Sequence, residues 1–126
     1  MKSTIFIVED SRTMRNLVRT ALEDDGYEVR ESADGRAALA ALRSLSPDLV
    51  IADINMPEMD GITLVREIRK LPALSRTPVL ILTTESDDAL KASARAAGAT
   101  GWIGKPFEPD QLRQVIARVL GRPRPE

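Results

Sequence analysis

The sequence predicts an α/β fold built on one five-stranded parallel sheet with helices on both faces. Short β-branched or apolar runs alternate five times with segments whose apolar residues recur every three or four positions. This strand–helix alternation implies right-handed βαβ crossovers and therefore a parallel sheet. Two of the runs are continuously apolar, which is typical of central strands that are covered on both faces.

The first strand is predicted at residues 4–8, a β-branched and aromatic run. An amphipathic helix follows at residues 12–25, where apolar side chains fall on one face. Asp10 or Ser11 can cap the start of this helix, and Gly26 ends it.

The second strand is predicted at residues 27–32, which alternate in polarity as a strand near a sheet edge does. Asp34-Gly35 then turns the chain. An Ala-rich amphipathic helix is predicted at residues 37–45, and Ser46-Pro47 closes it.

The third strand is predicted at residues 48–53, a continuous apolar run that carries one charged residue, Asp53, at its end. The Asn, Pro, Asp and Gly that follow are typical of a loop. Beyond the loop, helical spacing predicts a third helix over residues 62–71, which stops near Pro72.

The last two strands are predicted at residues 78–83, another buried apolar run, and at residues 101–104. A helix with a good N-terminal start is predicted between them, at residues 86–97, with Gly98 as its stop. The final helix is predicted at residues 109–119 because Pro and Asp open it and apolar residues line one face.

Composition limits the domain organisation and the possible chemistry. The 126-residue chain has the length of one domain, which we expect at residues 1–121, followed by a disordered tail at 122–126. A net charge of −1 argues against non-specific nucleic-acid binding. The chain has no Cys and no His, which excludes disulfides, thiolate or imidazole metal ligands and a Ser-His-Asp triad. The chemistry must use carboxylates, hydroxyls and Lys.

Targeting signals are not apparent in the sequence. The first apolar run is too short for a signal peptide, and no stretch approaches a membrane span. We therefore expect a cytoplasmic protein that does not insert into a membrane.

Polar residues follow four of the five predicted strands at their C-terminal ends, where open parallel sheets bind ligands. They are Glu9 and Asp10, Asp53 and Asn55, Thr83 and Thr84, and Lys105. Each alone is ordinary cap or turn chemistry. Together they bring three carboxylates, hydroxyls and one ammonium to one edge of the sheet.

This edge has the chemistry of a site for a hard cation. Carboxylate oxygens without imidazole or thiolate suit Mg²⁺, and a backbone carbonyl after Asp53 could add a ligand. Three carboxylates packed together repel one another, and Lys105 balances only one charge. An Asp carboxylate can also be the nucleophile toward a phosphoryl group, to which a Thr hydroxyl could donate a hydrogen bond.

The combined motifs resemble the receiver domain of two-component response regulators, over about residues 3–120. The residues that carry the resemblance are Glu9-Asp10, Asp53, Asn55-Met56-Pro57, Met59-Asp60-Gly61, Thr83 and Lys105-Pro106-Phe107. The resemblance implies a flavodoxin-like fold with strand order 2-1-3-4-5, for which a chemotaxis regulator of this family is itself the standard example.

The resemblance also implies a role for each site residue. Asp53 would accept a phosphoryl group from a phosphohistidine on a histidine kinase or phosphotransfer protein. Glu9, Asp10, Asp53 and the backbone carbonyl of Asn55 would hold Mg²⁺ or Mn²⁺. Lys105 would pair with the phosphoryl group.

Signal output would depend on a conformational switch. By the same resemblance, Thr83 would move to hydrogen-bond the phosphoryl group, and Trp102 would change rotamer with it. The Lys105-Pro106 peptide would be cis. An effector protein would dock on the face formed by the fourth helix, the fifth strand and the fifth helix. We expect a monomer, with phosphorylation-dependent dimerisation left open.

Two positions depart from the usual family pattern and two match a subgroup. Trp102 stands where Tyr or Phe is usual, which would make the rotamer switch bulkier or damped. Thr84 stands where Ala, Ser or Gly is frequent, and its β-branch could narrow access and slow phosphotransfer or hydrolysis. Asn55 and Glu85 match chemotaxis-type regulators and, with Thr84, are expected to tune access and rate.

Three outputs are open for such a chain. No DNA-binding or enzymatic domain follows Leu120, so we expect a stand-alone receiver. It would signal by docking, as chemotaxis-type regulators do on a flagellar switch. Alternatively, it would act as a phosphorelay or phosphate-sink intermediate.

Other protein classes fit the sequence less well. An aspartyl-nucleophile phosphatase of the haloacid dehalogenase type would need a second Asp where the chain has Asn55. A flavodoxin-like electron carrier would need a hydroxyl-rich phosphate loop and aromatics, whereas Glu9-Asp10 would repel the phosphate. An unphosphorylated docking module would leave the acidic site without a purpose.

Overall fold

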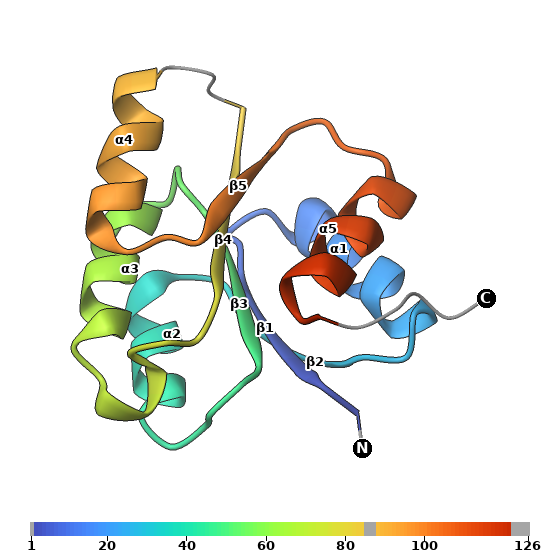
Figure 1. Ribbon diagram of the computed structural model, residues 1–126, viewed down its shortest axis with the longest axis horizontal. Coiled ribbons are helices and arrows are strands. Elements are labelled where there is room, and N and C mark those ends of the chain that lie inside the picture. Colours follow the sequence, from blue (N-terminus) through green and yellow to red (C-terminus); the bar gives the residue numbers. More distant parts are fainter. Residues whose placement is uncertain (1, 85–87, 122–126) are drawn as a thin grey trace.

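The computed structural model describes residues 2–84 and 88–121. It has a five-stranded parallel sheet in the order β2-β1-β3-β4-β5. Figure 1 shows α2, α3 and α4 on one face of this sheet and α1 and α5 on the other. The predicted fold class, strand order and two-sided helical cover are confirmed.

Strands and helices alternate along the chain. The strands are β1 (Thr4–Val8), β2 (Glu28–Ser32), β3 (Leu49–Asp53), β4 (Val79–Thr83) and β5 (Gly101–Gly104). The helices are α1 (Arg12–Asp24), α2 (Gly35–Leu42), α3 (Gly61–Arg69), α4 (Asp88–Ala97) and α5 (Pro109–Val119), with a short 3₁₀ turn, η1 (Pro72–Leu74), after α3.

The central strands supply both halves of the core. Every residue of β3 and β4 is buried. Alternate residues point to opposite faces: Val50 and Ala52 pack with α2, α3 and α4, whereas Leu49 and Ile51 pack with α1 and α5. The central strands are therefore packed between two apolar layers, and β3 and β4 carry polar groups only at their C-terminal ends.

Two helices end earlier than their apolar spacing predicts. After Leu42, the Ser44 N–H bonds the Ala41 carbonyl, and the Ser44 hydroxyl reaches the same oxygen. This competition ends α2, although Leu45 still packs on the core. Similarly, α3 ends at Arg69 because Pro72 forces Leu71 into an extended conformation.

Helix starts follow the capping chemistry of the sequence. Ser11 caps α1 by accepting the Met14 N–H at 3.2 Å. Asp34 caps α2 by accepting the Ala37 N–H at 2.8 Å, so the Asp34-Gly35 step begins a helix rather than only turning the chain. The predicted start of the fourth helix at Ser86-Asp87 and the tail at 122–126 lie outside the described residues. No helix within the described ranges is long and apolar enough to cross a bilayer.

Candidate functional site

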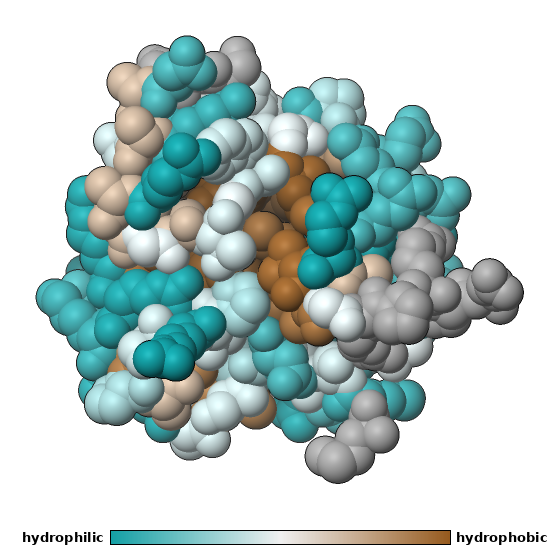
Figure 2. Space-filling model, viewed as in Figure 1, coloured by the Kyte–Doolittle hydropathy of each residue, from teal (hydrophilic) through white to brown (hydrophobic). Residues whose placement is uncertain are grey.

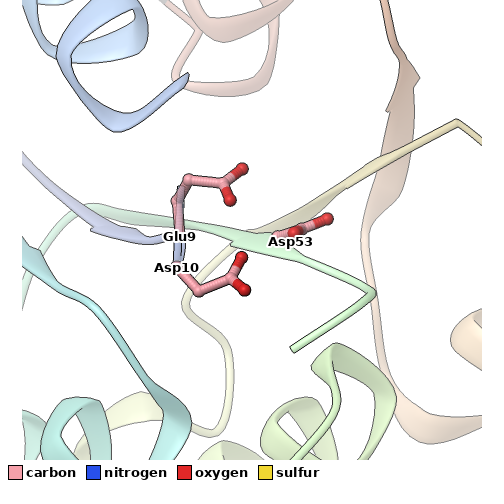
Figure 3. A group of neighbouring side chains, drawn as sticks. All are labelled: Glu9, Asp10 and Asp53. Atoms are coloured by element: carbon pink, nitrogen blue, oxygen red, sulfur yellow. The ribbon is translucent and has the colours of Figure 1, made fainter. Parts of the chain in front are cut away.

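Three carboxylates meet at the C-terminal edge of the sheet (Figure 3). Glu9 and Asp10 follow β1, and Asp53 is the last residue of β3. One oxygen from each lies within 4.8 Å of the others. Glu9 is fully buried and Asp53 is 5% exposed, whereas Asp10 is exposed to solvent. The sheet thus brings together the three acidic side chains that the sequence predicts.

Lys105, which follows β5, bridges two of these carboxylates. Its Nζ donates to Glu9 Oε1 at 3.0 Å and to Asp53 Oδ1 at 3.1 Å. Burial alone would lower the pKa of the Lys105 ammonium, but its hydrogen bonds and attraction to Glu9 and Asp53 raise that pKa. Lys105 therefore stays charged at neutral pH, and it balances one of three acidic groups.

Glu9 is the most constrained residue of the site. Its Oε2 accepts the Ser11 N–H at 3.0 Å, while its other carboxylate oxygen faces Lys105. Burial raises the pKa of the Glu9 carboxyl, the Ser11 N–H and Lys105 oppose that rise, and the charge of Asp53 adds to it. Keeping the buried Glu9 carboxylate ionised therefore costs free energy. A cation bound beside it would offset that cost.

The loop after Asp53 turns sharply against the strand. The Asn55 N–H donates to Asp53 Oδ1 at 3.4 Å, and the Asn55 side chain is exposed. The Met59 N–H bonds the Pro57 carbonyl at 2.7 Å, which places Glu58 at φ +67°. The Asn-Met-Pro segment is thus a tight loop whose backbone runs directly beside Asp53.

Gly61, the first residue of α3, lies almost against the end of β3. A Cβ at this position would lie 2.5 Å from the Asp53 carbonyl oxygen, which no side chain tolerates. The Gly61 N–H also bonds the Ile54 carbonyl at 3.0 Å. This close approach explains why the loop ends in Asp60-Gly61.

Thr83 and Trp102 lie on the side of the site that faces α4. Thr83 ends β4 and is 3% exposed, and its carbonyl accepts the Lys105 N–H at 2.7 Å. Trp102 is the second residue of β5. Thr83 and Trp102 line one small pocket, together with Leu90 and Ala94 of α4. Thr83 thus connects the acidic edge to the packing of α4.

The Trp102 ring is covered by two cations from α4. Lys91 Nζ lies 5.0 Å from the ring centroid, and Arg95 Cζ lies 5.2 Å from it. These distances are within the range of cation–π attraction. The sequence contains both cations at a helical spacing of four, but only the packing of α4 on β5 places them on Trp102.

The remaining predicted site residues are placed as follows. Thr84 is exposed directly after β4, and the Lys105-Pro106 peptide is cis. Glu85 lies outside the described residues. Arg15 was not among the predicted site residues, yet its Nη1 donates to the Glu9 carbonyl at 2.6 Å. No local sequence signal marks this contact, because Arg15 reads as one polar residue of an amphipathic helix.

The donor set fits a hard divalent cation. Mg²⁺ prefers six oxygens at about 2.1 Å, so opposite oxygens of its shell lie about 4.2 Å apart. The 4.8 Å spread of the three carboxylate oxygens is close to this value. Small side-chain adjustments or one bridging water would complete the fit. The three carboxylates also outnumber the single Lys105 ammonium, and this excess of negative charge favours a bound cation.

The family model for the response regulator receiver domain matches residues 5–117. The chain belongs to the response regulator receiver family. These receivers are signalling domains that interact with histidine kinases or phosphotransfer proteins and bind Mg²⁺ at an acidic site. The acidic group of Glu9, Asp10 and Asp53 is the candidate for such a site in this chain.

The chain is similar to chemotaxis regulators over nearly its whole length. It is 36% identical to the chemotaxis protein CheY of Bacillus subtilis, covering 95% of this chain and 99% of that protein. The crystal structure of CheY4 from Vibrio cholerae has a TM-score of 0.92 and 41% identity, covering 94% and 99% of the two chains.

Receivers also occur within longer proteins. The receiver spans 25% to 52% of the length of three other curated relatives, among them the regulatory protein AtoC of Escherichia coli. A further structure, the receiver domain of sensor histidine kinase PA1611 from Pseudomonas aeruginosa, has a TM-score of 0.89 and 27% identity. It covers 96% of this chain and 99% of that one, and it contains a magnesium ion coordinated in its active-site cleft.

Proposed function

We propose that Asp53 accepts a phosphoryl group from a phosphohistidine on a histidine kinase or phosphotransfer protein. One observation carries this proposal: Lys105 Nζ bridges Asp53 and Glu9 at the acidic edge. Asp53 contacts the ammonium directly, and its carboxylate lies within 4.8 Å of those of Glu9 and Asp10, which would hold the cation with it. A phosphoryl group on it would be flanked by positive charge from both sides.

The reaction is a displacement at phosphorus. A carboxylate oxygen of Asp53 attacks the phosphorus, the bond to the imidazole nitrogen breaks, and the imidazole leaves with the electron pair. Water later attacks the same phosphorus, which releases inorganic phosphate and restores the carboxylate. The phosphohistidine supplies the phosphoryl group, so no other co-reactant is needed.

The chain's own residues supply orientation and charge. Lys105 would shift from the carboxylates toward the phosphoryl oxygens, and the Thr83 hydroxyl would donate to one of them. Glu9, Asp10, Asp53 and the Asn55 carbonyl would hold Mg²⁺, which supplies positive charge that neutralises the transferring phosphoryl group. Thr84, with Asn55 and Glu85, would tune access to the phosphoryl group and its lifetime.

The output of this chain would pass through α4, β5 and α5. Movement of Thr83 would change the pocket that it shares with Trp102 and so bias the packing of α4. Figure 2 shows apolar surface in the hollow between α4 and α5, where β5 forms the sheet edge. We propose that a protein effector docks on this face when Asp53 is phosphorylated.

The proposal is tested by Trp102 fluorescence, because Trp102 is the only Trp of the chain. Mg²⁺ with beryllofluoride, a mimic of the phosphoryl group, should change the emission of the wild type. Asp53→Asn should not respond. An equal response in both proteins, or no response in the wild type, would contradict the proposal.

A further inference from the structure

Arg15 of α1 is joined to the acidic edge through the backbone rather than through a carboxylate. Its side chain is only 15% exposed, and Nη1 donates to the Glu9 carbonyl at 2.6 Å. This carbonyl belongs to the peptide unit between Glu9 and Asp10. The orientation of that peptide sets the direction in which both acidic side chains leave the backbone.

Glu9 and Asp10 depend on that peptide to different degrees. Glu9 is also fixed by its N–H, which bonds the Ser32 carbonyl at 3.1 Å, and by both carboxylate oxygens. Asp10, in contrast, is exposed, so the apolar core does not hold its side chain. The Glu9–Asp10 peptide, to which Arg15 is hydrogen-bonded, is therefore a principal constraint on the direction of the Asp10 carboxylate.

Glu31 of β2 compensates the charge that Arg15 brings to the site. Glu31 Oε1 lies 3.8 Å from Arg15 Nε, and its other oxygen lies 3.1 Å from Arg19 Nη1. An uncompensated guanidinium beside the acidic edge would repel a divalent cation. With Glu31 beside it, Arg15 can hold the peptide while adding little net charge.

The geometry points to Arg15 as a positioning residue for the cation site, acting on Asp10 through the Glu9–Asp10 peptide and buttressed by Glu31. This inference rests on the proposed function, in which Glu9, Asp10 and Asp53 hold Mg²⁺. Arg15 touches neither the cation nor the phosphoryl group in this account. Its contribution is to the affinity for Mg²⁺, which groups that orient metal ligands commonly change by about tenfold or more.

The sign of the effect separates positioning from charge. If Arg15 positions Asp10, then Arg15→Met weakens Mg²⁺ binding on the order of tenfold, despite the loss of a repelling positive charge. If Arg15 acts only as a nearby charge, then the same substitution strengthens Mg²⁺ binding. The two accounts therefore predict opposite shifts in the dissociation constant.

Arg19→Met is the matched control. Arg19 lies on the same helix and also pairs with Glu31, but its other partner is Glu23 rather than the Glu9 carbonyl. We expect Arg19→Met to leave the Mg²⁺ dissociation constant within about twofold of the wild type, as substitutions of surface residues away from a site generally do.

The experiment titrates the full chain with Mg²⁺ alone and follows backbone amide signals by NMR. Unfolding in urea with EDTA reports the stability of each variant separately. Arg15→Gln, which is neutral and shorter, makes the same prediction if Arg15→Met does not fold. Wild-type or tighter Mg²⁺ binding by the folded Arg15 variant overturns this inference alone. Failure of the wild type to bind Mg²⁺ instead contradicts the proposed function.

Discussion

Lys105 Nζ lies 3.1 Å from Asp53 Oδ1, joining the ends of β5 and β3 across 52 residues of sequence. The contact is nearly dry, because the Lys105 and Asp53 side chains are 13% and 7% exposed. The ammonium therefore competes with any cation for the same carboxylates. This competition gives Lys105 two separable effects, one on Mg²⁺ affinity and one on phosphoryl transfer.

Lys105→Met should separate these two effects. Mg²⁺ should bind more tightly, because a competing positive charge is gone. Phosphorylation by acetyl phosphate at saturating Mg²⁺ should slow by about tenfold or more, because the charge that stabilises the transferring group is lost. Calorimetry measures the first effect, and the rate of phosphoprotein formation measures the second. Unchanged rates would show that Lys105 has no part in transfer.

Glu9→Gln should stabilise the protein in EDTA. Burial raises the pKa of Glu9 above the ordinary value of a Glu carboxyl, so the native state binds a proton that the unfolded state releases. Stability from this group is therefore present below the unfolded pKa and is lost as pH rises through the folded pKa. Gln mimics the protonated form at every pH.

Urea unfolding in EDTA from pH 4 upward tests this linkage. The free energy of unfolding of Glu9→Gln minus that of the wild type should grow as pH rises. Adding Mg²⁺ at neutral pH should shrink or reverse the difference, because only the wild type has the Glu9 carboxylate as a ligand. A difference that is constant with pH would show that Glu9 has the same pKa in both states.

Gly61→Ala should destabilise the fold. The new Cβ would lie 2.5 Å from the Asp53 carbonyl oxygen and 2.9 Å from Ile54 Cα, so the backbone must move. Overpacking of this kind costs roughly 1–3 kcal/mol. Gly104→Ala is the control, since a Cβ there meets nothing within 4 Å. Equal free energies of unfolding for the two variants would argue against the close approach.

The contact between Lys91 and Trp102 should be measurable as a coupling energy. A double-mutant cycle with Lys91→Met and Trp102→Leu should give about 0.5–1 kcal/mol, as expected for a cation–π pair that remains partly exposed to solvent. The cycle uses free energies of unfolding from urea titrations. A Gln114→Met and Trp102→Leu cycle provides a reference, because Gln114 is an exposed residue of another helix, α5. A coupling energy no larger than this reference would show that the Lys91 ammonium does not attract the ring.

The sequence predicts the strands and the acidic edge well because their signals are local. A buried parallel strand is a short apolar run, and a polar residue at its end must lie at the sheet edge. Asp53, Glu9 and Asp10 could therefore be placed together before any contact was known. Lys105 lies beside these carboxylates because it directly follows β5 at the same edge of the sheet.

Contacts between elements were not predictable in this way. The hydrogen bond from Arg15 to the Glu9 carbonyl depends on how α1 packs relative to the end of β1. The apolar periodicity of a helix does not specify such a side-chain hydrogen bond. Arg69 is similar: it looks like an ordinary basic residue at a helix end. In the structure its guanidinium donates to the carbonyls of Leu74, Thr77 and Gly98, which ties α3 to the end of α4. Such bonds arise from packing, which a single sequence does not encode locally.

The most direct test of the central claim is intact-mass analysis after incubation with acetyl phosphate and Mg²⁺. The wild type should gain the mass of one phosphoryl group, and peptide mapping should place it on Asp53. EDTA should abolish the gain, and Asp53→Asn should not show it, whereas Asp60→Asn, at the cap of α3, should behave as the wild type. A gain that persists in Asp53→Asn, or its absence from the wild type, would contradict the assignment of Asp53 as the phosphoryl acceptor.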